Sequence, residues 1–385
     1  MRNSFLSFSV PLIGEEEIEE VVATLRSSWI TTGPKTKQFE AEFGRSIGAR
    51  GALALNSCTA ALHTALATMG VGKGDEVITT PMTFAASVNV IEHVGARPVL
   101  VDVEADTLNI DPMAVADAVT SRTRAVLPVH FAGHPAEMDP IQHLAEVNGL
   151  MVVEDAAHAL PSKYRGRTIG SGGNPTAFSF YATKNLVTAE GGMLTGEPGF
   201  LERARIWSLH GMSSDAWKRY HAGGKWFYEV VVPGYKYNMT DIQSSIGLWQ
   251  LRKLEAFQQR RREIVGNYSR AFEGIEPLQV PSQRAHVDHA WHLYVLRLRI
   301  DRLRIGRDEF IEVLARKNIG TSVHFIPVHM HPYYRDKYGY TPSHFPVAYD
   351  GYARSLSLPL CPSLSDKDVN DVIEAVLETV EEYLA

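Results

Sequence analysis

The run Leu150-Met151-Val152-Val153 is the feature that most constrains the fold of this chain. Four successive apolar residues between Gly149 and Glu154 indicate a strand that is covered on both faces. Strands of this kind belong to parallel sheets, in which the connecting helices pack on both sides. Similar short runs recur through the first part of the chain. We predict strands over residues 51–55, 76–80, 98–102, 124–129, 150–154, 177–181 and 192–196.

Amphipathic patterns between several of these strands predict crossover helices, over residues 59–69, 84–94, 112–119 and 138–148. An acidic helix over 15–27 precedes them, and a long helical pattern over 240–272 follows. Beyond it we predict strands over 290–300 and 321–325, and helices over 307–318 and 366–383. The sequence therefore predicts an α/β fold. Its large, mostly parallel, seven-stranded α/β/α domain spans residues 1–250, and a smaller C-terminal α+β domain spans residues 251–385.

A lysine and an aspartate accompany two of the predicted strands. Lys184 follows the 177–181 strand and Asp155 ends the 150–154 strand. Pyridoxal phosphate (PLP) needs this pairing, because a lysine amine forms a Schiff base with its aldehyde and a carboxylate keeps its pyridine nitrogen protonated. Taken singly, each residue has a simpler interpretation, because most lysines are solvated surface groups and most aspartates at strand ends are caps. Their order and neighbours favour a PLP site in which Lys184 is the catalytic residue.

Small residues at the junction of a strand and a helix predict where the cofactor phosphate binds. In Asn56-Ser57-Cys58-Thr59-Ala60, small residues leave the backbone N–H groups of a helix N-terminus free to point at a phosphate. We assign Ser57, Thr59 and Ala60 to this site, and Ser179 near the end of a neighbouring strand as a further hydroxyl. A plain helix cap is the alternative, since Ser and Thr favour that position in any helix.

Two ring-bearing residues complete the predicted cofactor site. Phe84 opens a helix after Thr80-Pro81-Met82-Thr83, where a flat aromatic side chain can stack on a pyridine ring. His158 follows Asp155 by three positions, where it can bond the ring hydroxyl or support the carboxylate. A core phenylalanine and a packed imidazole are the alternatives for these two residues.

Composition and spacing exclude several other classes of function. The formal net charge of −6 disfavours a nucleic-acid partner. No apolar run is long enough to predict a membrane span. The two cysteines, Cys58 and Cys361, are far apart, which fits a reducing, cytoplasmic location. His130 and His134, like the group His324, His329 and His331, raise the question of a metal. HExxH is absent and Gly133 and Pro135 interrupt any helix, so we predict no metal site.

The chain resembles the DegT-type family of PLP-dependent sugar aminotransferases, which has PLP fold type I. The resemblance covers nearly the whole length, and the segments that carry it are 29–34, 56–63, 74–79, 152–158, 179–185, 190–192 and 234–241. It implies a homodimer with shared active sites, in which Asn238 reaches the phosphate of the other subunit and the loop over 211–237 closes over the neighbouring site. It also implies that Thr31, Tyr181, His324 and His329 face the substrate.

Within the family the sequence is most similar to the aminotransferases that make UDP-4-amino-4-deoxy-L-arabinose, through segments 29–34, 128–130, 154–159 and 233–238. The resemblance implies that glutamate is the amino donor, 2-oxoglutarate the co-product, and a UDP-linked 4-keto pentose the acceptor. Two positions depart from those enzymes: Phe84 replaces a tryptophan and Tyr181 a histidine. A 4-keto-6-deoxyhexose linked to UDP, dTDP or GDP is therefore the alternative substrate.

Three other activities fit the same fold. A sugar dehydratase carries histidine in place of the Schiff-base lysine, whereas Lys184 is present here. A ligand sensor without activity would have lost Lys184 or Asp155, and both are retained. An enzyme of free amino acids would need an arginine for the substrate carboxylate, for which Arg165, Arg219 and Arg354 are candidates.

Overall fold

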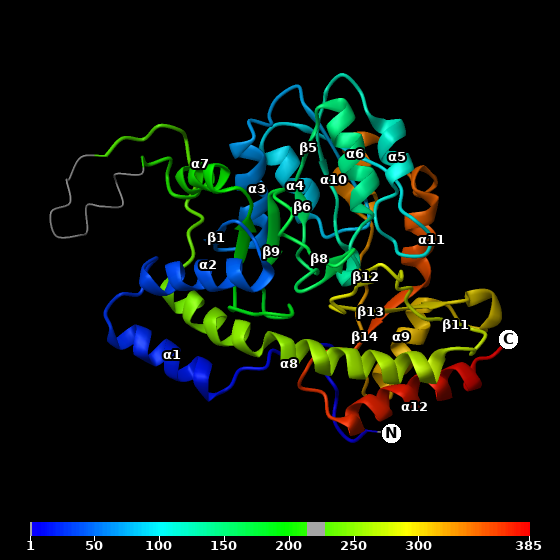
Figure 1. The fold of residues 1–385 in the computed structure, drawn as a ribbon. Helices are drawn as coiled ribbons and strands as arrows, with labels where there is room; N and C mark the ends of the chain where they lie inside the picture. The colour runs from blue at the N-terminus through cyan, green and yellow to red at the C-terminus, as the bar shows by residue number, and fades with distance from the viewer. Residues whose placement is uncertain (1, 214–227) are drawn as a thin grey trace.

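A single row of strands organises the large unit of the protein (Figure 1). The computed structural model describes residues 2–213 and 228–385. Its strand order is β3-β2-β4, then β5 with β6, then β9-β10-β1. All neighbours are parallel except β10, which is antiparallel to both β9 and β1. The strands are β1 (Ala52–Leu55), β2 (Glu76–Thr79), β3 (Arg97–Leu100), β4 (Thr123–Leu127), β5 (Met151–Val152), β6 (Glu154–Asp155), β9 (Thr176–Ser179) and β10 (Gly192–Thr195).

The predicted strand over 150–154 is interrupted in the structure. Its two parts, β5 and β6, pair with β4 and β9 respectively, and Val153 between them still donates its N–H to Val126 O. Counting β5 and β6 as one strand, the described residues form the predicted seven-stranded, mostly parallel sheet.

Side chains that alternate along each strand enter two separate cores, one on each face of the sheet. On β4, Ala125 and Leu127 pack towards α3 (Cys58–Thr68), α4 (Ala86–His93) and α7 (Pro198–Ser208). Val126 packs on the other face, towards α2 (Pro34–Ile47), α5 (Pro112–Ala118) and α6 (Met138–Asn148). This double burial is the reason for the continuous apolar runs, and it confirms the predicted α/β/α layering.

The long helix α8 (Asp241–Phe272) joins the large unit to the small one. Its first half packs against α1 (Glu15–Arg26) and α2, and its last part packs against α12 (Asp366–Glu382), as Figure 1 shows. The predicted domain boundary between residues 250 and 251 falls inside this helix. Division of the chain at that point remains a proposal.

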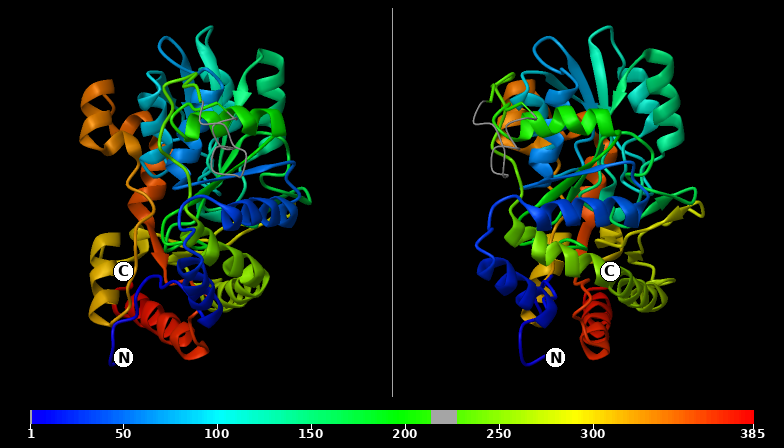
Figure 2. Two further views of the ribbon diagram at one scale, coloured as in Figure 1. Left: turned by 90° about the vertical axis from the view of Figure 1, so that its left-hand side faces the viewer. Right: turned by 60° about the vertical axis from the view of Figure 1, so that its left-hand side comes forward.

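The small unit is a three-stranded antiparallel sheet with helices around it. Its strands are β11 (Leu278–Gln279), β13 (Tyr294–Leu298) and β14 (Ser355–Leu358), and its helices are α9 (Arg307–Arg316), α11 (Pro346–Arg354) and α12. Helix α10 (Pro332–Tyr338) packs instead against α4 of the large unit, where Lys337 pairs with Glu92 at 2.6 Å. A separate small sheet combines β7 (Lys163–Tyr164), β8 (Arg167–Thr168) and β12 (Val287–Asp288). Both chain ends lie on the side of the small unit (Figure 2).

Two local predictions are corrected. Residues 321–325 form no strand: Ser322 makes one isolated bridge to Ser357, and the chain then leaves the sheet and packs Phe325 on His158. The predicted helix over 84–94 begins at Ala86, so Phe84 lies on the turn before it. Among the described residues, no helix combines the length and the apolar character that crossing a bilayer requires.

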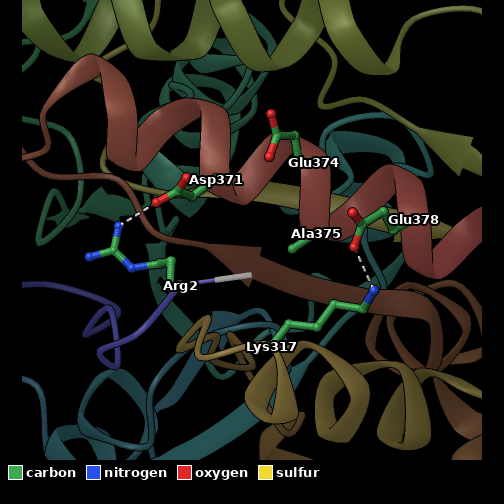
Figure 3. Close-up of a pocket in the computed structure, with 6 residues that line it drawn as sticks. All are labelled: Arg2, Lys317, Asp371, Glu374, Ala375 and Glu378. Carbon is green, nitrogen blue, oxygen red and sulfur yellow. Dashed lines mark hydrogen bonds and ion pairs between the residues drawn. The ribbon is translucent and has the colours of Figure 1, made fainter.

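A groove lined by charged side chains lies between the N-terminal segment, Lys317 and α12 (Figure 3). Arg2 pairs with Asp371 at 2.8 Å, and Lys317 pairs with Glu378 at 2.8 Å. Because its cations are already paired with carboxylates of the same chain, we interpret the groove as a seam of the small unit and not as a ligand site.

Candidate active site

The structure brings Lys184 and Asp155 together at the carboxyl ends of two neighbouring strands. Asp155 ends β6, which lies parallel to β9 with Asp155 opposite Ala177. Lys184 lies on the turn after β9, where its N–H donates to Tyr181 O at 2.9 Å. The pair predicted from the sequence therefore comes from adjacent strands of one sheet.

Asp155 is a buried carboxylate that is surrounded by neutral donors. Its side chain is only 4% exposed and accepts hydrogen bonds from Ser87 Oγ at 2.7 Å and from the Ala157 N–H at 3.0 Å. The Cys58 thiol lies 3.9 Å from Oδ1, the carboxylate oxygen that also accepts from Ala157. In residues 2–213 and 228–385 no cation forms an ion pair with it. A buried carboxylate in this setting is suited to a cationic ligand atom.

Lys184 is partly buried, and burial lowers the pKa of its amine to about 8, against the opposing attraction of Cys58 and Asp155. An ammonium group loses hydration when it is buried, so the neutral amine gains relative to it. A substantial fraction of Lys184 is therefore neutral and nucleophilic near physiological pH. Its Nζ lies 3.4 Å from His292 Nε2.

The predicted phosphate residues surround the N-terminus of α3. Ser57 is the N-cap, and its hydroxyl accepts from the Ala60 N–H at 3.0 Å. The N–H groups of Cys58 and Thr59 have no partner within the helix, because they belong to its first turn. A Cβ on Gly192 would lie 2.6 Å from Cys58 N, so only glycine lets β10 approach this turn. Ser179 lies opposite Gly192 in the pairing of β9 and β10.

Three ring-bearing residues lie around the lysine and aspartate. His158 is buried, packs on Phe325 with ring centres 5.7 Å apart, and has an Nδ1 atom without a partner in the described part of the chain. Phe84 is 65% exposed and Tyr181 is 48% exposed. An unpartnered buried nitrogen and two open aromatic faces are features of a site that binds another molecule.

The residues assigned to the substrate by resemblance lie in different environments. His324 Nδ1 is 2.9 Å from Ser357 Oγ, and burial and the Lys184 charge lower the pKa of His324 to about 4. Thr31 is exposed and its carbonyl accepts from the Asp241 N–H. His329 is fully buried against Phe345, so in this conformation it offers no surface to a substrate. The substrate roles of all four residues remain predictions.

Asn238 lies beside the end of β1 in its own chain. Its backbone bridges to Leu55, its amide donates to Thr32 Oγ1 at 2.7 Å, and its oxygen accepts from Lys236 Nζ at 2.6 Å. Most of the predicted loop over 211–237 that precedes it, residues 214–227, lies outside the described residues. The role of Asn238 across a subunit interface therefore remains a prediction.

Two of the histidines considered for a metal, His130 and His134, have hydrogen-bond partners of their own. His130 Nε2 lies 3.0 Å from Glu154 Oε2, and its Nδ1 accepts from the Ala136 N–H. His134 Nδ1 lies 2.7 Å from Pro135 O. Within the described ranges, no three His, Cys, Asp or Glu side chains are grouped as a metal site would require.

Two of the arginines considered for an amino-acid carboxylate are engaged elsewhere. Arg165 pairs with Asp139 at 2.8 Å, and Arg354 with Asp350 on the same helix. Arg219, the third candidate, lies outside the described residues.

Sequence reasoning missed the residues that hold the catalytic pair in place. Ser87 contacts Asp155, His292 contacts Lys184, and Asn185 contacts His292. Asn185 lies inside the 179–185 segment, so the motif itself was a signal for it. Ser87 and His292 are distant in sequence from the residues they contact, and no local pattern marks them.

Comparison with known proteins identifies the chain. Residues 11–377 match the DegT/DnrJ/EryC1/StrS aminotransferase family. The chain belongs to this family. It is 55% identical over 381 residues to the spore coat polysaccharide biosynthesis protein SpsC of Bacillus subtilis, with 98% of each chain covered.

The chain is also similar to solved structures of aminotransferases. A putative sugar aminotransferase of Streptococcus pneumoniae, Spr1654, in its PMP form has a TM-score of 0.93 and 38% identity, covering 98% of this chain and 99% of that one. Its PLP form has a TM-score of 0.92. PseC of Helicobacter pylori, an aminotransferase involved in the biosynthesis of pseudoaminic acid, has a TM-score of 0.91 and 28% identity, covering 98% of this chain and all of PseC.

The protein is thus a PLP-dependent sugar aminotransferase of fold type I. Its own residues fit the cofactor. Among the described residues, the buried Asp155 carboxylate has no ion-pair partner and His158 Nδ1 has no hydrogen-bond partner, and the first turn of α3 presents free N–H groups. When bound there, PLP supplies an aldehyde for the Lys184 amine and a ring that withdraws electrons from the substrate carbon.

Proposed function

We propose that this aminotransferase transfers the amino group of glutamate to C4 of a nucleotide-linked 4-keto sugar, and that the sugar is a UDP-linked pentose. The observation that carries the proposal is the exposed aromatic surface of two residues close to the catalytic pair. Tyr181, whose carbonyl accepts from the Lys184 N–H, is 48% exposed, and Phe84, whose carbonyl accepts from the N–H of the Asp155 partner Ser87, is 65% exposed. Apolar ring faces suit the C–H face of a sugar ring. The resemblance of segments 29–34, 128–130 and 233–238 to the arabinose enzymes selects the pentose.

In the proposed reaction Lys184 moves the proton. Its Nζ, once free, takes a proton from the α-carbon of glutamate; the amino group would then stay with the bound cofactor, and water would supply the keto oxygen of the 2-oxoglutarate that leaves. In the second half the same atom delivers a proton to C4 of the sugar. The amine can do both because its pKa of about 8 lies near the working pH. The Asp155 carboxylate would stabilise the protonated form of the pyridine nitrogen. Ser57, Thr59, Ser179 and Asn238 would bind the phosphate.

A 4-keto-6-deoxyhexose is the second candidate substrate. Among the solved relatives, PseC is involved in the biosynthesis of pseudoaminic acid and not of an arabinose nucleotide, so a sugar other than the pentose is a candidate. Phe84 and Tyr181 also differ from the arabinose enzymes at the site itself. One additional methyl group in an apolar pocket changes discrimination by only about 10–200-fold, so few residues can decide between the two sugars.

We further propose that the protein is a cytoplasmic homodimer. Ile18, Val22 and Leu25 share one exposed face of α1, and Trp29 and Ile30 extend this apolar surface. An apolar surface of this kind is favourable when a second copy covers it. Cys58 and Cys361 are both buried free thiols, in keeping with a reducing compartment.

A product assay tests the substrate. The purified enzyme would be given glutamate and, separately, a UDP-4-keto pentose and 4-keto-6-deoxyhexoses on UDP, dTDP and GDP. We expect the highest kcat/KM for the UDP-pentose. A clear preference for a hexose would overturn the pentose and leave the 4-keto sugar class standing, whereas failure with every nucleotide sugar would overturn the class.

A further inference from the structure

A chain of hydrogen bonds determines which nitrogen of His292 faces Lys184. It begins at Asn185, whose amide donates to Leu160 O and to Ala290 O, each at 2.9 Å. Both amide hydrogens are thereby used. The Oδ1 atom of Asn185, an acceptor, lies 3.2 Å from His292 Nδ1.

The tautomer of His292 follows from this arrangement. Since Asn185 Oδ1 can only accept, His292 Nδ1 must carry the hydrogen. A neutral imidazole with hydrogen on Nδ1 has a lone pair on Nε2. That lone pair faces Lys184 Nζ, 3.4 Å away.

The surrounding backbone keeps the His292 ring in place. The His292 N–H donates to Ala132 O at 3.1 Å, and its carbonyl accepts from the buried Arg261 guanidinium. The ring packs on His158 with centres 4.4 Å apart. Gly133 lies at φ +99°, where a Cβ would approach His158 O and His292 N, so glycine is required for this close packing.

We propose that His292 is a positioning residue for Lys184: its Nε2 accepts a hydrogen from the Lys184 amine whenever that amine is free, and so holds the amine at the reacting atoms. This inference rests on the lysine-dependent reaction of the family and is independent of the sugar and the donor proposed above. His292 Nε2 gives the site a hydrogen-bond acceptor for Lys184 that was not among the residues predicted from the sequence.

A pH effect distinguishes this role from simple packing. Groups that act electrostatically on Lys184 or His292 are Asp155, Cys58, His158, His324 and Arg261. Burial holds the pKa of His158, His292 and His324 well below neutrality and raises the pKa of Cys58, so the Lys184 amine is the group that titrates near pH 8.

An acceptor stabilises the ammonium form of lysine more than the neutral amine, because the hydrogen bond is then charge-assisted. Loss of the His292 acceptor should therefore lower the pKa of Lys184. It should also slow reactions of the neutral amine, because the amine is no longer oriented.

The test is capture of PLP by the full-length, cofactor-free protein, followed by visible absorbance from about pH 6 to pH 9.5. In the wild type the rate should rise with pH through a midpoint near 8, as Lys184 loses its proton. His292→Phe keeps a ring against His158 but removes the acceptor. We expect a lower midpoint and a plateau rate reduced about 10-fold.

His292→Gln is the matched control, since its amide oxygen can still accept, and it should stay near the wild-type midpoint. An unchanged midpoint and plateau in His292→Phe would overturn the proposal. Neither experiment requires a sugar or an amino donor, so failure here is distinct from failure of the proposed function.

A measurement on the wild-type protein covers the case in which His292→Phe does not fold. Nitrogen-15 NMR of labelled histidines, with His292 assigned through the His292→Gln variant, reports which ring nitrogen is protonated. We expect hydrogen on Nδ1 and none on Nε2 between about pH 6 and pH 9. Hydrogen on Nε2 would overturn the proposal.

Discussion

The Ser87 hydroxyl donates a 2.7 Å hydrogen bond to the Asp155 carboxylate, and the two residues come from a helix and a strand that are far apart in the sequence. Ser87 is in the first turn of α4, whereas Asp155 ends β6. The hydroxyl fixes one carboxylate oxygen without cancelling its charge. This hydrogen bond therefore keeps the Asp155 carboxylate oriented for a ring nitrogen.

Ser87→Ala should reduce kcat by about 10-fold while leaving PLP bound, because a hydrogen bond to a charged group contributes about 1.5–3 kcal/mol. Steady-state kinetics and the absorbance spectrum measure both effects. Thr83→Val is the matched control: the Thr83 hydroxyl contacts Ser87 at 2.7 Å but makes no contact with Asp155. Equal losses in the two variants would show that the effect is general packing.

Asp155→Asn should fold and lose at least about 100-fold in kcat, since an amide cannot hold the pyridine nitrogen in its protonated form. Circular dichroism would establish the fold, and turnover with glutamate the loss. Activity within a few-fold of wild type would mean that another carboxylate serves the ring.

Lys184→Ala should abolish both the Schiff-base absorption of the bound cofactor and turnover, because the Lys184 amine is the group that engages the aldehyde. The spectrum of the purified protein and a product assay check the two outcomes. Full turnover in this variant would show that Lys184 is not the catalytic residue.

Lys184→Met should stabilise the cofactor-free protein at neutral pH. The pKa of Lys184 is lowered from 10.5 to about 8 in the folded state, so folding is opposed wherever the amine is charged in both states. The loss of folding stability caused by the buried ammonium group is complete below pH 8 and disappears as the pH rises to about 10.5. We expect a gain of about 1–3 kcal/mol in the free energy of unfolding at pH 7.

Urea denaturation of the two proteins at several pH values measures this gain. It should shrink between about pH 8 and pH 10.5, where the wild-type lysine becomes neutral in the folded state first. A gain that stays constant across this range would indicate improved packing by methionine and not removal of a buried charge.

Mixed dimers test whether Asn238 acts across a subunit interface. Lys184→Ala and Asn238→Ala chains, each inactive or impaired alone, would be co-refolded in equal amounts. One site of each hybrid dimer then has both native residues, so about a quarter of wild-type activity should return. Size-exclusion chromatography at the assay concentration provides the control. Activity no greater than the sum of the separate variants, or an active monomer, would contradict the shared site.

Local patterns were sufficient for the elements that carry the chemistry. The apolar run before Asp155 and the motif around Lys184 are each contiguous in sequence, so the strands and the pair at their ends were predictable. The same is true of the cap at Ser57, whose hydroxyl bonds Ala60 within one helical turn.

The failures have a different origin. The 321–325 segment has the composition of a strand, but only Ser322 meets a partner, and side chains in the site decide the rest of its course. Helix α2 was not predicted at all, and its apolar residues Phe39 and Phe43 are explained only by the rings of Phe178 and Phe180 against which they pack.

By itself, the sequence determined that this chain builds a sheet covered on both faces, with a lysine and an aspartate at the carboxyl ends of two of its strands. Periodicity and short motifs are sufficient for this, because each involves only residues that are close in sequence. Tertiary structure alone decided that Ser87 orients Asp155 and that Asn185 sets the tautomer of His292 beside Lys184. Hydrogen bonds between residues far apart in the chain depend on how strands and helices pack, and no local pattern encodes that geometry.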